Sequence, residues 1–201
     1  DRRKIQVEEL KNYWSKSLLP KIKTHLTPSF HEIDDGTFIT FSKEQKKYIK
    51  PNPGKVHVIE GAAGSGKSMI IAQRAANVAS QDKTVLILSY NITLRKYLEE
   101  QVNRAEFGFH DELITITHFH RKLKDLAIHY HVGRVDCKSG DKDVYRNILL
   151  NIAWPQKLID RLKNKSRHTH DKFDAIYIDE GQDFTDEMFE LVKYLKKDNS
   201  D

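Results

Sequence analysis

The fold of this chain is decided by Gly61-Ala62-Ala63-Gly64-Ser65-Gly66-Lys67-Ser68. This stretch fits G-x-x-x-x-G-K-[ST], the pattern of a loop that cradles phosphate groups. Its glycines allow the backbone to curl tightly, because a positive φ costs glycine little, and the curled backbone points several N–H groups inward. The apolar run Val56–Glu60 predicts a buried strand before the loop, and Met69–Ala76 predicts a helix after it. Strand, loop and helix in this order predict a phosphate site.

Two side chains of the loop carry the chemistry of this pattern. Lys67 is expected to reach the β- and γ-phosphates of a nucleotide, and the Ser68 hydroxyl is expected to bind Mg²⁺. The alternative is a glycine-rich turn with a chance lysine, which ordinary composition produces in about 1% of chains of this length. We expect the nucleotide to contact every residue from Gly61 to Ser68, and also Met69.

Composition excludes several other classes of site. The 201 residues carry a formal net charge of +5, which permits a polyanionic partner without requiring one. The single cysteine, Cys137, excludes an internal disulfide and a cysteine metal cluster, and the ten histidines show no H-E-x-x-H spacing. No apolar run approaches the ~20 residues of a membrane span and no signal peptide is visible, so we expect a cytoplasmic protein.

The order of apolar runs predicts an α/β fold. Val85–Leu88 is fully apolar, which is typical of a parallel strand buried on both faces, and Leu113–Thr117 and Ala175–Ile178 predict two more strands. Helical patterns separate these runs, which favours a mostly parallel sheet flanked by helices. Residues 121–172 are expected to form a helical insertion before the last strand.

The chain divides into two expected regions. Residues 1–40 predict a helical extension or linker, and residues 41–201 predict an incomplete nucleotide-binding domain. The chain starts with Asp1 rather than Met and stops at Asp201 just after a helical pattern. We therefore expect it to be a piece of a longer protein.

A pair of carboxylates follows the last predicted strand directly. A carboxylate at the end of a buried strand is costly unless it is paired or lies near a metal. Asp179 is expected to hold Mg²⁺ through water, and Glu180 to orient and deprotonate the attacking water. Gln182 is expected to link the nucleotide site to its surroundings. The alternative is an acidic turn that caps the helix after Thr185.

Gln45 lies about a dozen residues before the predicted phosphate strand and has two interpretations. Its amide offers one donor and one acceptor, which can pair with N6 and N7 of adenine. Alternatively, Ser42 caps a helix that runs to about Ile49, and Gln45 is its partner in a capping box. We favour adenine recognition.

Polar and aromatic side chains also end the two other predicted strands. Ligands of open α/β sheets bind at the carboxyl ends of strands, so Tyr90 and Asn91 are candidate nucleic-acid contacts. Thr117, His118 and Phe119 are candidates at the end of the next strand. Stacking of a base on an aromatic ring is worth about 1–3 kcal/mol and tolerates any base sequence. The alternatives are core packing for Tyr90 and a strand-to-helix cap for Thr117, His118 and Phe119.

Together these stretches resemble a known family of motor proteins. Gln45, Gly61–Ser68, Ser89–Asn91, Thr117–His120 and Asp179–Asp183 are similar to the Q motif and motifs I, Ia, Ib and II of superfamily 1 helicases of the UvrD/Rep type. The resemblance covers residues 41–195. It implies a RecA-like first motor domain that uses ATP and Mg²⁺ and moves along single-stranded DNA, with RNA as the alternative strand.

Two departures from the family pattern affect the expected activity. Met69 replaces an arginine that often stacks on adenine, and motifs III to VI are absent from these 201 residues. The resemblance places the arginine fingers in a second motor domain, whose loss costs about 10³–10⁵ in rate. We therefore expect the piece to bind ATP weakly and to hydrolyse it slowly, whereas the longer parent is expected to be an active helicase. The alternatives are a regulatory nucleic-acid-binding module and the motor part of a nuclease-helicase or defence enzyme.

Overall fold

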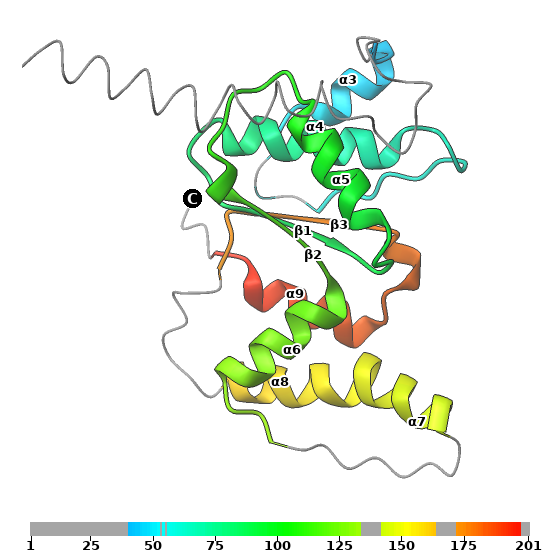
Figure 1. Cartoon of the computed structure of the whole chain (residues 1–201), viewed down its shortest axis with the longest axis vertical. Helices are drawn as coiled ribbons and strands as arrows, with labels where there is room; N and C mark the ends of the chain where they lie inside the picture. Colours follow the sequence, from blue (N-terminus) through cyan, green and yellow to red (C-terminus); the bar gives the residue numbers. More distant parts are fainter. Residues whose placement is uncertain (1–39, 53, 55, 134–141, 164–171, 198–201) are drawn as a thin grey trace, which may run out of the picture. The chain divides into compact units, whose positions relative to one another are not determined.

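The computed structural model describes residues 40–52, 54, 56–133, 142–163 and 172–197 (Figure 1). The expected extension over residues 1–40, apart from Thr40, lies outside the described residues, as does Cys137. No described helix is long and apolar enough to cross a membrane.

Three strands form one parallel sheet in the order β2-β1-β3, which confirms the predicted α/β fold. The strands are β1 (Val85–Ser89), β2 (Ile114–His118) and β3 (Ala175–Asp179). The helices are α3 (Lys43–Ile49), α4 (Lys67–Ala79), α5 (Leu94–Asn103), α6 (Phe119–His129), α7 (Lys142–Ile148), α8 (Trp154–Lys163) and α9 (Asp186–Leu195), with short helical turns η2 (Asp111–Leu113), η3 (Leu149–Ala153) and η4 (Gly181–Asp183).

The middle strand of the sheet is the most deeply buried. All five residues of β1 are buried, whereas the residues of the outer strands β2 and β3 are mostly half-buried. The apolar run Val85–Leu88 therefore forms a strand that is buried on both faces, as its composition predicts.

The described residues fall into two compact units. Unit 1 comprises Asp1–Val85 and Lys96–Ile116, and unit 2 comprises Leu86–Arg95 and Thr117–Asp201. The phosphate loop belongs to unit 1, and the acidic turn after β3 belongs to unit 2.

In unit 1, helix α3 packs on helix α4, which confirms the helix predicted after the loop. Phe41 and Ile49 meet Ile70 in a small apolar cluster, here called the α3–α4 cluster. Arg74 of α4 is 7% exposed and donates a hydrogen bond of 3.1 Å from Nη1 to the carbonyl oxygen of Tyr48. This buried bond to the end of α3 holds the helix that carries Gln45 beside the helix that begins at the loop.

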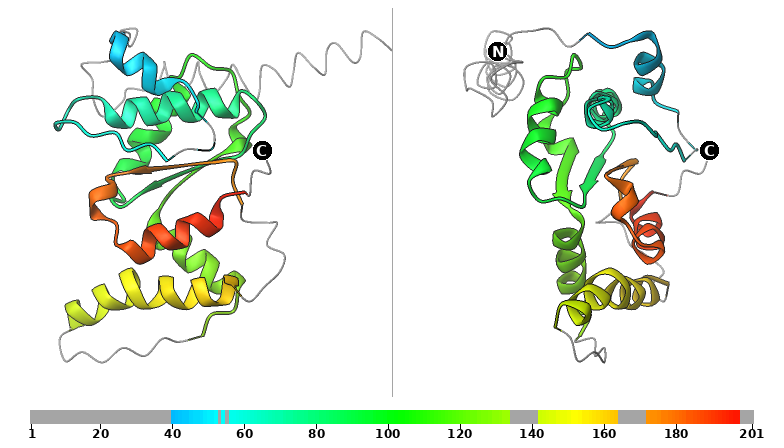
Figure 2. Two further views of the ribbon diagram at one scale, coloured as in Figure 1. Left: turned by 180° about the vertical axis from the view of Figure 1, so that it is seen from behind. Right: turned by 90° about the vertical axis from the view of Figure 1, so that its right-hand side faces the viewer.

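In unit 2, helices α6, α8 and α9 pack together around a core that includes the inner residues of β1. Figure 2 shows these helices from two further sides. The largest buried side chains of this core include Leu86, Phe119 and Leu158. The described part of residues 121–172 is mainly helical, and its identity as an insertion stays a prediction.

The strand predicted over Val56–Glu60 is wrong. These residues have no regular secondary structure, and Val56 and Val58 are 95% and 78% exposed. A short apolar run forms a strand only where a neighbouring strand supplies cross-strand pairs, and in the described sheet those pairs are made by β1, β2 and β3. Ile59 instead packs its half-buried side chain against the α3–α4 cluster.

Two valine substitutions test this description. Val85→Ala removes two methyl groups from a fully buried position and should lower the free energy of unfolding by about 2 kcal/mol. The same change at the exposed Val58 should cost less than about 0.5 kcal/mol. Urea unfolding of both variants beside the unsubstituted chain measures the difference. Equal losses at the two positions would show that Val58 is packed in a sheet after all.

Candidate functional site

The phosphate loop lies open to solvent ahead of helix α4. Residues 61–65 are exposed, and the backbone turns at Gly64 and Gly66, whose φ angles are +77° and +86°. Side-chain-bearing residues rarely adopt such angles, so both positions need glycine. Gly66 is the N-cap residue of α4, and no side chain caps this end of the helix. The first N–H groups of α4 are thus suited to an anion.

The ammonium group of Lys67 points back into its own loop. Its Nζ donates hydrogen bonds to the carbonyl oxygens of Gly61 at 2.8 Å and Ala62 at 3.0 Å. The loop therefore holds a positive charge at its mouth through neutral acceptors. Phosphate oxygens form stronger, charge-assisted bonds with an ammonium group and can replace these carbonyls. Ser68 lies beside Lys67 in the first turn of α4.

Gln45 contacts the loop and also caps its own helix. Its Oε1 accepts from the backbone N–H of Ser42 at 2.8 Å, and the Ser42 hydroxyl accepts from the backbone N–H of Gln45 at 3.1 Å. This capping box is the structural alternative that the sequence offered. The same side chain donates from Nε2 to the carbonyl oxygen of Ser65 at 3.1 Å. A Cβ atom added at Gly66 would lie 3.0 Å from Nε2, so Gln45 closes tightly on the loop.

The acidic turn at the end of β3 is conformationally strained. Asp179 is 3% exposed, and Glu180 adopts the left-handed conformation at φ 55° and ψ 45°. A non-glycine residue pays of order 1–2 kcal/mol for this conformation, and such strain concentrates at functional sites. The Gln182 amide donates to a carboxylate oxygen of Glu180. Gln182, which the sequence predicts to link the nucleotide site to its surroundings, therefore holds the carboxylate of Glu180, the expected base.

The turn does not act as the cap of the following helix. Thr185 is the N-cap residue of α9, and its hydroxyl accepts from the backbone N–H of Met188 at 3.4 Å. Thr185 therefore already provides the helix cap that the alternative interpretation assigned to the acidic residues.

The two side chains expected to hold Mg²⁺, those of Ser68 and Asp179, offer a hydroxyl and a carboxylate. Oxygen donors of this kind suit Mg²⁺, which usually takes one or two protein ligands and completes its shell with water and substrate phosphates. Within the described ranges, no group of three or more His, Cys, Asp or Glu side chains forms a metal centre. Ser68 and Asp179 therefore fit the ion by donor type. That both residues bind the same ion stays a prediction, because Ser68 belongs to unit 1 and Asp179 to unit 2.

The candidate nucleic-acid contacts of unit 2 differ in exposure. Asn91 is exposed, and its Oδ1 accepts from the backbone N–H and the hydroxyl of Thr93 at 3.0 and 2.9 Å. Thr117 and His118 are half-buried at the end of β2. Phe119 is only 2% exposed and lies in the core of unit 2. We therefore withdraw Phe119 from the expected nucleic-acid contacts.

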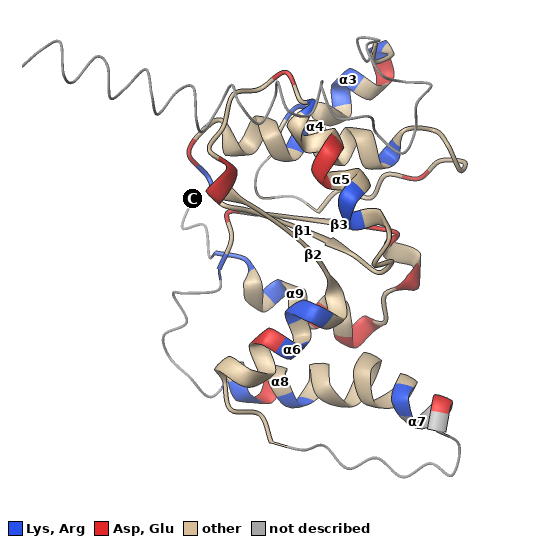
Figure 3. Cartoon of the chain, in the orientation of Figure 1, with Lys and Arg blue, Asp and Glu red and all other residues tan. Residues whose placement is uncertain are grey.

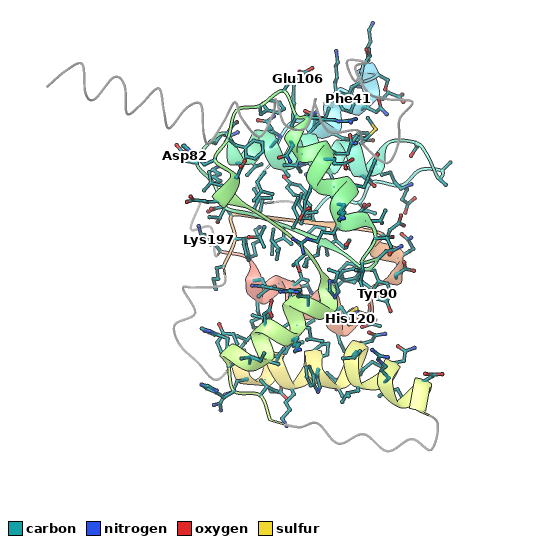
Figure 4. The ribbon with its side chains drawn as sticks, viewed as in Figure 1. Phe41, Asp82, Tyr90, Glu106, His120 and Lys197 are labelled. Carbon is teal, nitrogen blue, oxygen red and sulfur yellow. The ribbon has the colours of Figure 1, made fainter. Side chains whose placement is uncertain are left out.

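Tyr90 lies between core and surface. Its half-buried ring packs against the core of unit 2 and meets the rings of His120 and Phe184 edge-on, at centroid distances of 5.4 and 6.3 Å. Figure 4 shows the labelled Tyr90 and His120 together at this place. Sequence reasoning missed one neighbour, Asn151 of η3, because a single polar residue in an apolar helical pattern gives no functional signal.

Positive charge gathers where β2 passes into α6. The pKa of His118 is lowered from 6.5, mainly because burial disfavours the charged ring, and further by His120, Arg121 and Arg95; Asp125 opposes the shift. Figure 3 shows other basic residues along α6. The charge at this end of unit 2 is thus of the sign that attracts anions.

The lowered pKa of His118 predicts a pH effect on stability. Because the folded state holds this proton less tightly, the unfolded state binds more protons as the pH falls through 6.5, and the free energy of unfolding decreases. The decrease between about pH 7.5 and about pH 5.5 should be smaller in His118→Gln, as measured by urea unfolding at both pH values. An identical decrease in the variant would contradict the assignment to His118.

A comparison with models of known protein families identifies the family of this chain. A family model described as an AAA domain matches residues 45–200, so that the matched region begins at Gln45 and includes the phosphate loop and the acidic turn. No match was found among the curated proteins or among the solved structures. The family consists of P-loop, helicase-like domains that also occur in UvrD/Rep-type proteins. Because the match covers more than half of the chain, the protein belongs to the AAA domain family of P-loop NTPases.

Proposed function

We propose that this chain is the ATP-binding part of a UvrD/Rep-type helicase or translocase. In this proposal the parent protein couples hydrolysis of Mg-ATP to movement on single-stranded nucleic acid, DNA or RNA. The observation that carries it is the loop geometry, with Gly64 and Gly66 at positive φ and the Lys67 ammonium held at the loop mouth. The family match to P-loop NTPases supports it.

The proposed chemistry divides between the loop and the acidic turn. Lys67 and the N–H groups at the start of α4 would bind the β- and γ-phosphates. Ser68 and Asp179 would hold Mg²⁺, which neutralises charge on the phosphate oxygens when it is bound. Glu180 would accept a proton from the attacking water at a carboxylate oxygen. Gln182 donates to that carboxylate and would hold it in position.

Adenine recognition by Gln45 requires an exchange of partners. Its Oε1 and Nε2 are bonded to Ser42 and Ser65, so an adenine that pairs with both atoms would displace both contacts. Each such hydrogen bond contributes about 1 kcal/mol net, and the two bonds to the base would offset the loss. In this proposal, binding of the base releases Gln45 from the loop.

Movement on a single strand would use the carboxyl ends of β1 and β2. We propose Tyr90, Asn91, Thr117 and His118 as the contacts, with a base meeting the Tyr90 ring and the positive charge near His118 attracting the phosphates. The lowered pKa of His118 supports this, because part of it comes from neighbouring positive charge. A second motor domain in the parent would supply the arginine fingers and close on the nucleotide.

Binding of a nucleotide tests the role of the loop. Lys67→Ala should abolish binding of a fluorescent ATP analogue, because it removes the cation that faces the phosphates. Lys83→Ala is the matched control at an exposed position of the same unit and should bind like the unsubstituted chain. Survival of binding in Lys67→Ala would show that the site assignment is wrong.

The parent protein permits a second arm of the same experiment. Glu180→Gln should keep ATP affinity and stop hydrolysis, because it removes the base but not the phosphate contacts. Hydrolysis by the unsubstituted parent should rise on addition of single strands. A flat response would favour the regulatory module over the motor.

A further inference from the structure

A buried amide in unit 2 joins the two rings at the ends of β1 and β2. Asn151 is 9% exposed and lies on the π-helical turn η3. Its Oδ1 lies 2.7 Å from Nε2 of His120, and its Nδ2 donates to the hydroxyl oxygen of Tyr90 at 3.5 Å. The Tyr90 and His120 rings also touch each other edge-on. One side chain thus contacts both aromatic groups.

These bonds fix which atoms of the two rings are left for a ligand. A carbonyl-type oxygen only accepts, so His120 must carry its proton on Nε2, and its Nδ1 is then an acceptor when the ring is neutral. The Tyr90 oxygen accepts from Asn151, so its own proton points elsewhere. Among the described residues, none accepts this proton or donates to Nδ1 of His120. The pair therefore offers one donor and one acceptor.

Asn151 is itself held from two sides. Its Nδ2 also donates to Oδ1 of Asn147, and its backbone oxygen accepts from the Thr185 hydroxyl at 2.8 Å. Thr185 caps α9 directly after the acidic turn. Single π-helical turns are rare and occur frequently at functional sites. The backbone of Asn151 is thus held by Thr185, directly after the acidic turn, while its side-chain amide contacts the two rings.

The Asn151 amide is expected to contribute little to the free energy of unfolding. A buried amide must form hydrogen bonds to recover the cost of leaving water, about 1–3 kcal/mol, and its net gain over a well-packed apolar side chain is small. An apolar residue would continue the pattern of the neighbouring Leu149 and Ile152. What the amide adds is the orientation of Tyr90 and His120.

We propose that Asn151 is a positioning residue for single-strand binding. It sets the protonated nitrogen of His120 and the direction of the Tyr90 hydroxyl, so that the two rings present an acceptor and a donor to the edge of an unpaired nucleobase. This inference rests on the proposed function, and it assigns to that function a residue outside the motifs.

The test uses the full 201-residue chain and two independent readouts. The first is the ¹⁵N spectrum of the histidine rings, which reports the protonated nitrogen of His120. The second is the affinity for oligothymidylate, measured by fluorescence anisotropy beside the affinity for an ATP analogue. Gln156→Leu is the matched control, because it replaces an exposed amide of α8 that bonds Glu187 and neither of the two rings in the described part of the chain.

Asn151→Leu should lose the preference for a proton on Nε2 of His120. It should also weaken oligothymidylate binding about tenfold, as expected from the loss of one or two hydrogen bonds, and leave the affinity for the ATP analogue within about twofold. Gln156→Leu should change none of these. An unchanged ring spectrum or unchanged oligothymidylate affinity in Asn151→Leu would overturn the inference.

Two further outcomes remain decisive. Should Asn151→Leu not fold, Tyr90→Phe removes only the hydroxyl and should weaken oligothymidylate binding about threefold with the His120 spectrum intact; unchanged affinity would overturn the inference. If the unsubstituted chain has the expected His120 spectrum and binds the ATP analogue but no oligonucleotide, the nucleic-acid part of the proposed function fails, and the positioning role fails with it.

Discussion

The ammonium group of Lys67 is the charge around which unit 1 is arranged. Carbonyl oxygens of Gly61 and Ala62 hold it, and they reach it only because the backbone turns at two glycines with positive φ. Gln45 closes the other side of the loop by bonding Ser65. Arg74 in turn fixes the helix of Gln45 against α4. These hydrogen bonds of unit 1 thus keep one positive charge at an open loop, which is the preorganisation that the proposed binding of a triphosphate needs.

Unit 2 contains a strained backbone position in its own predicted functional segment, the acidic turn. Glu180 adopts a left-handed conformation at the end of β3, and Gln182 donates a hydrogen bond to its carboxylate. Thr185 caps the next helix, so the carboxylates of the turn are not needed as its cap. The same threonine bonds the backbone of Asn151, whose side chain contacts Tyr90 and His120. Hydrogen bonds therefore connect the two rings through Asn151 to Thr185, which follows the acidic turn in the chain.

Sequence reasoning succeeded where a local pattern fixes the structure. The fully apolar run Val85–Leu88 became the buried middle strand, and the glycine-lysine pattern became a loop that starts a helix. It failed at Val56–Glu60, because an apolar run does not reveal whether a partner strand is present. Phe119 was misjudged because an aromatic residue at a strand end has the same pattern whether its ring points into the core or outward. Asn151 was missed because its role exists only through residues distant in sequence.

We propose that the loop of Lys67 and the acidic turn bind the same Mg-ATP complex. Paramagnetic broadening by Mn²⁺-ATP tests it directly in the ¹⁵N-labelled chain, because Mn²⁺ replaces Mg²⁺ and broadens amide signals near the metal. We predict broadening of both Gly66 and Gly181 but not of Gly133, and loss of the effect at Gly181 in Lys67→Ala. Broadening at the loop alone, or at Gly181 regardless of Lys67, would contradict it.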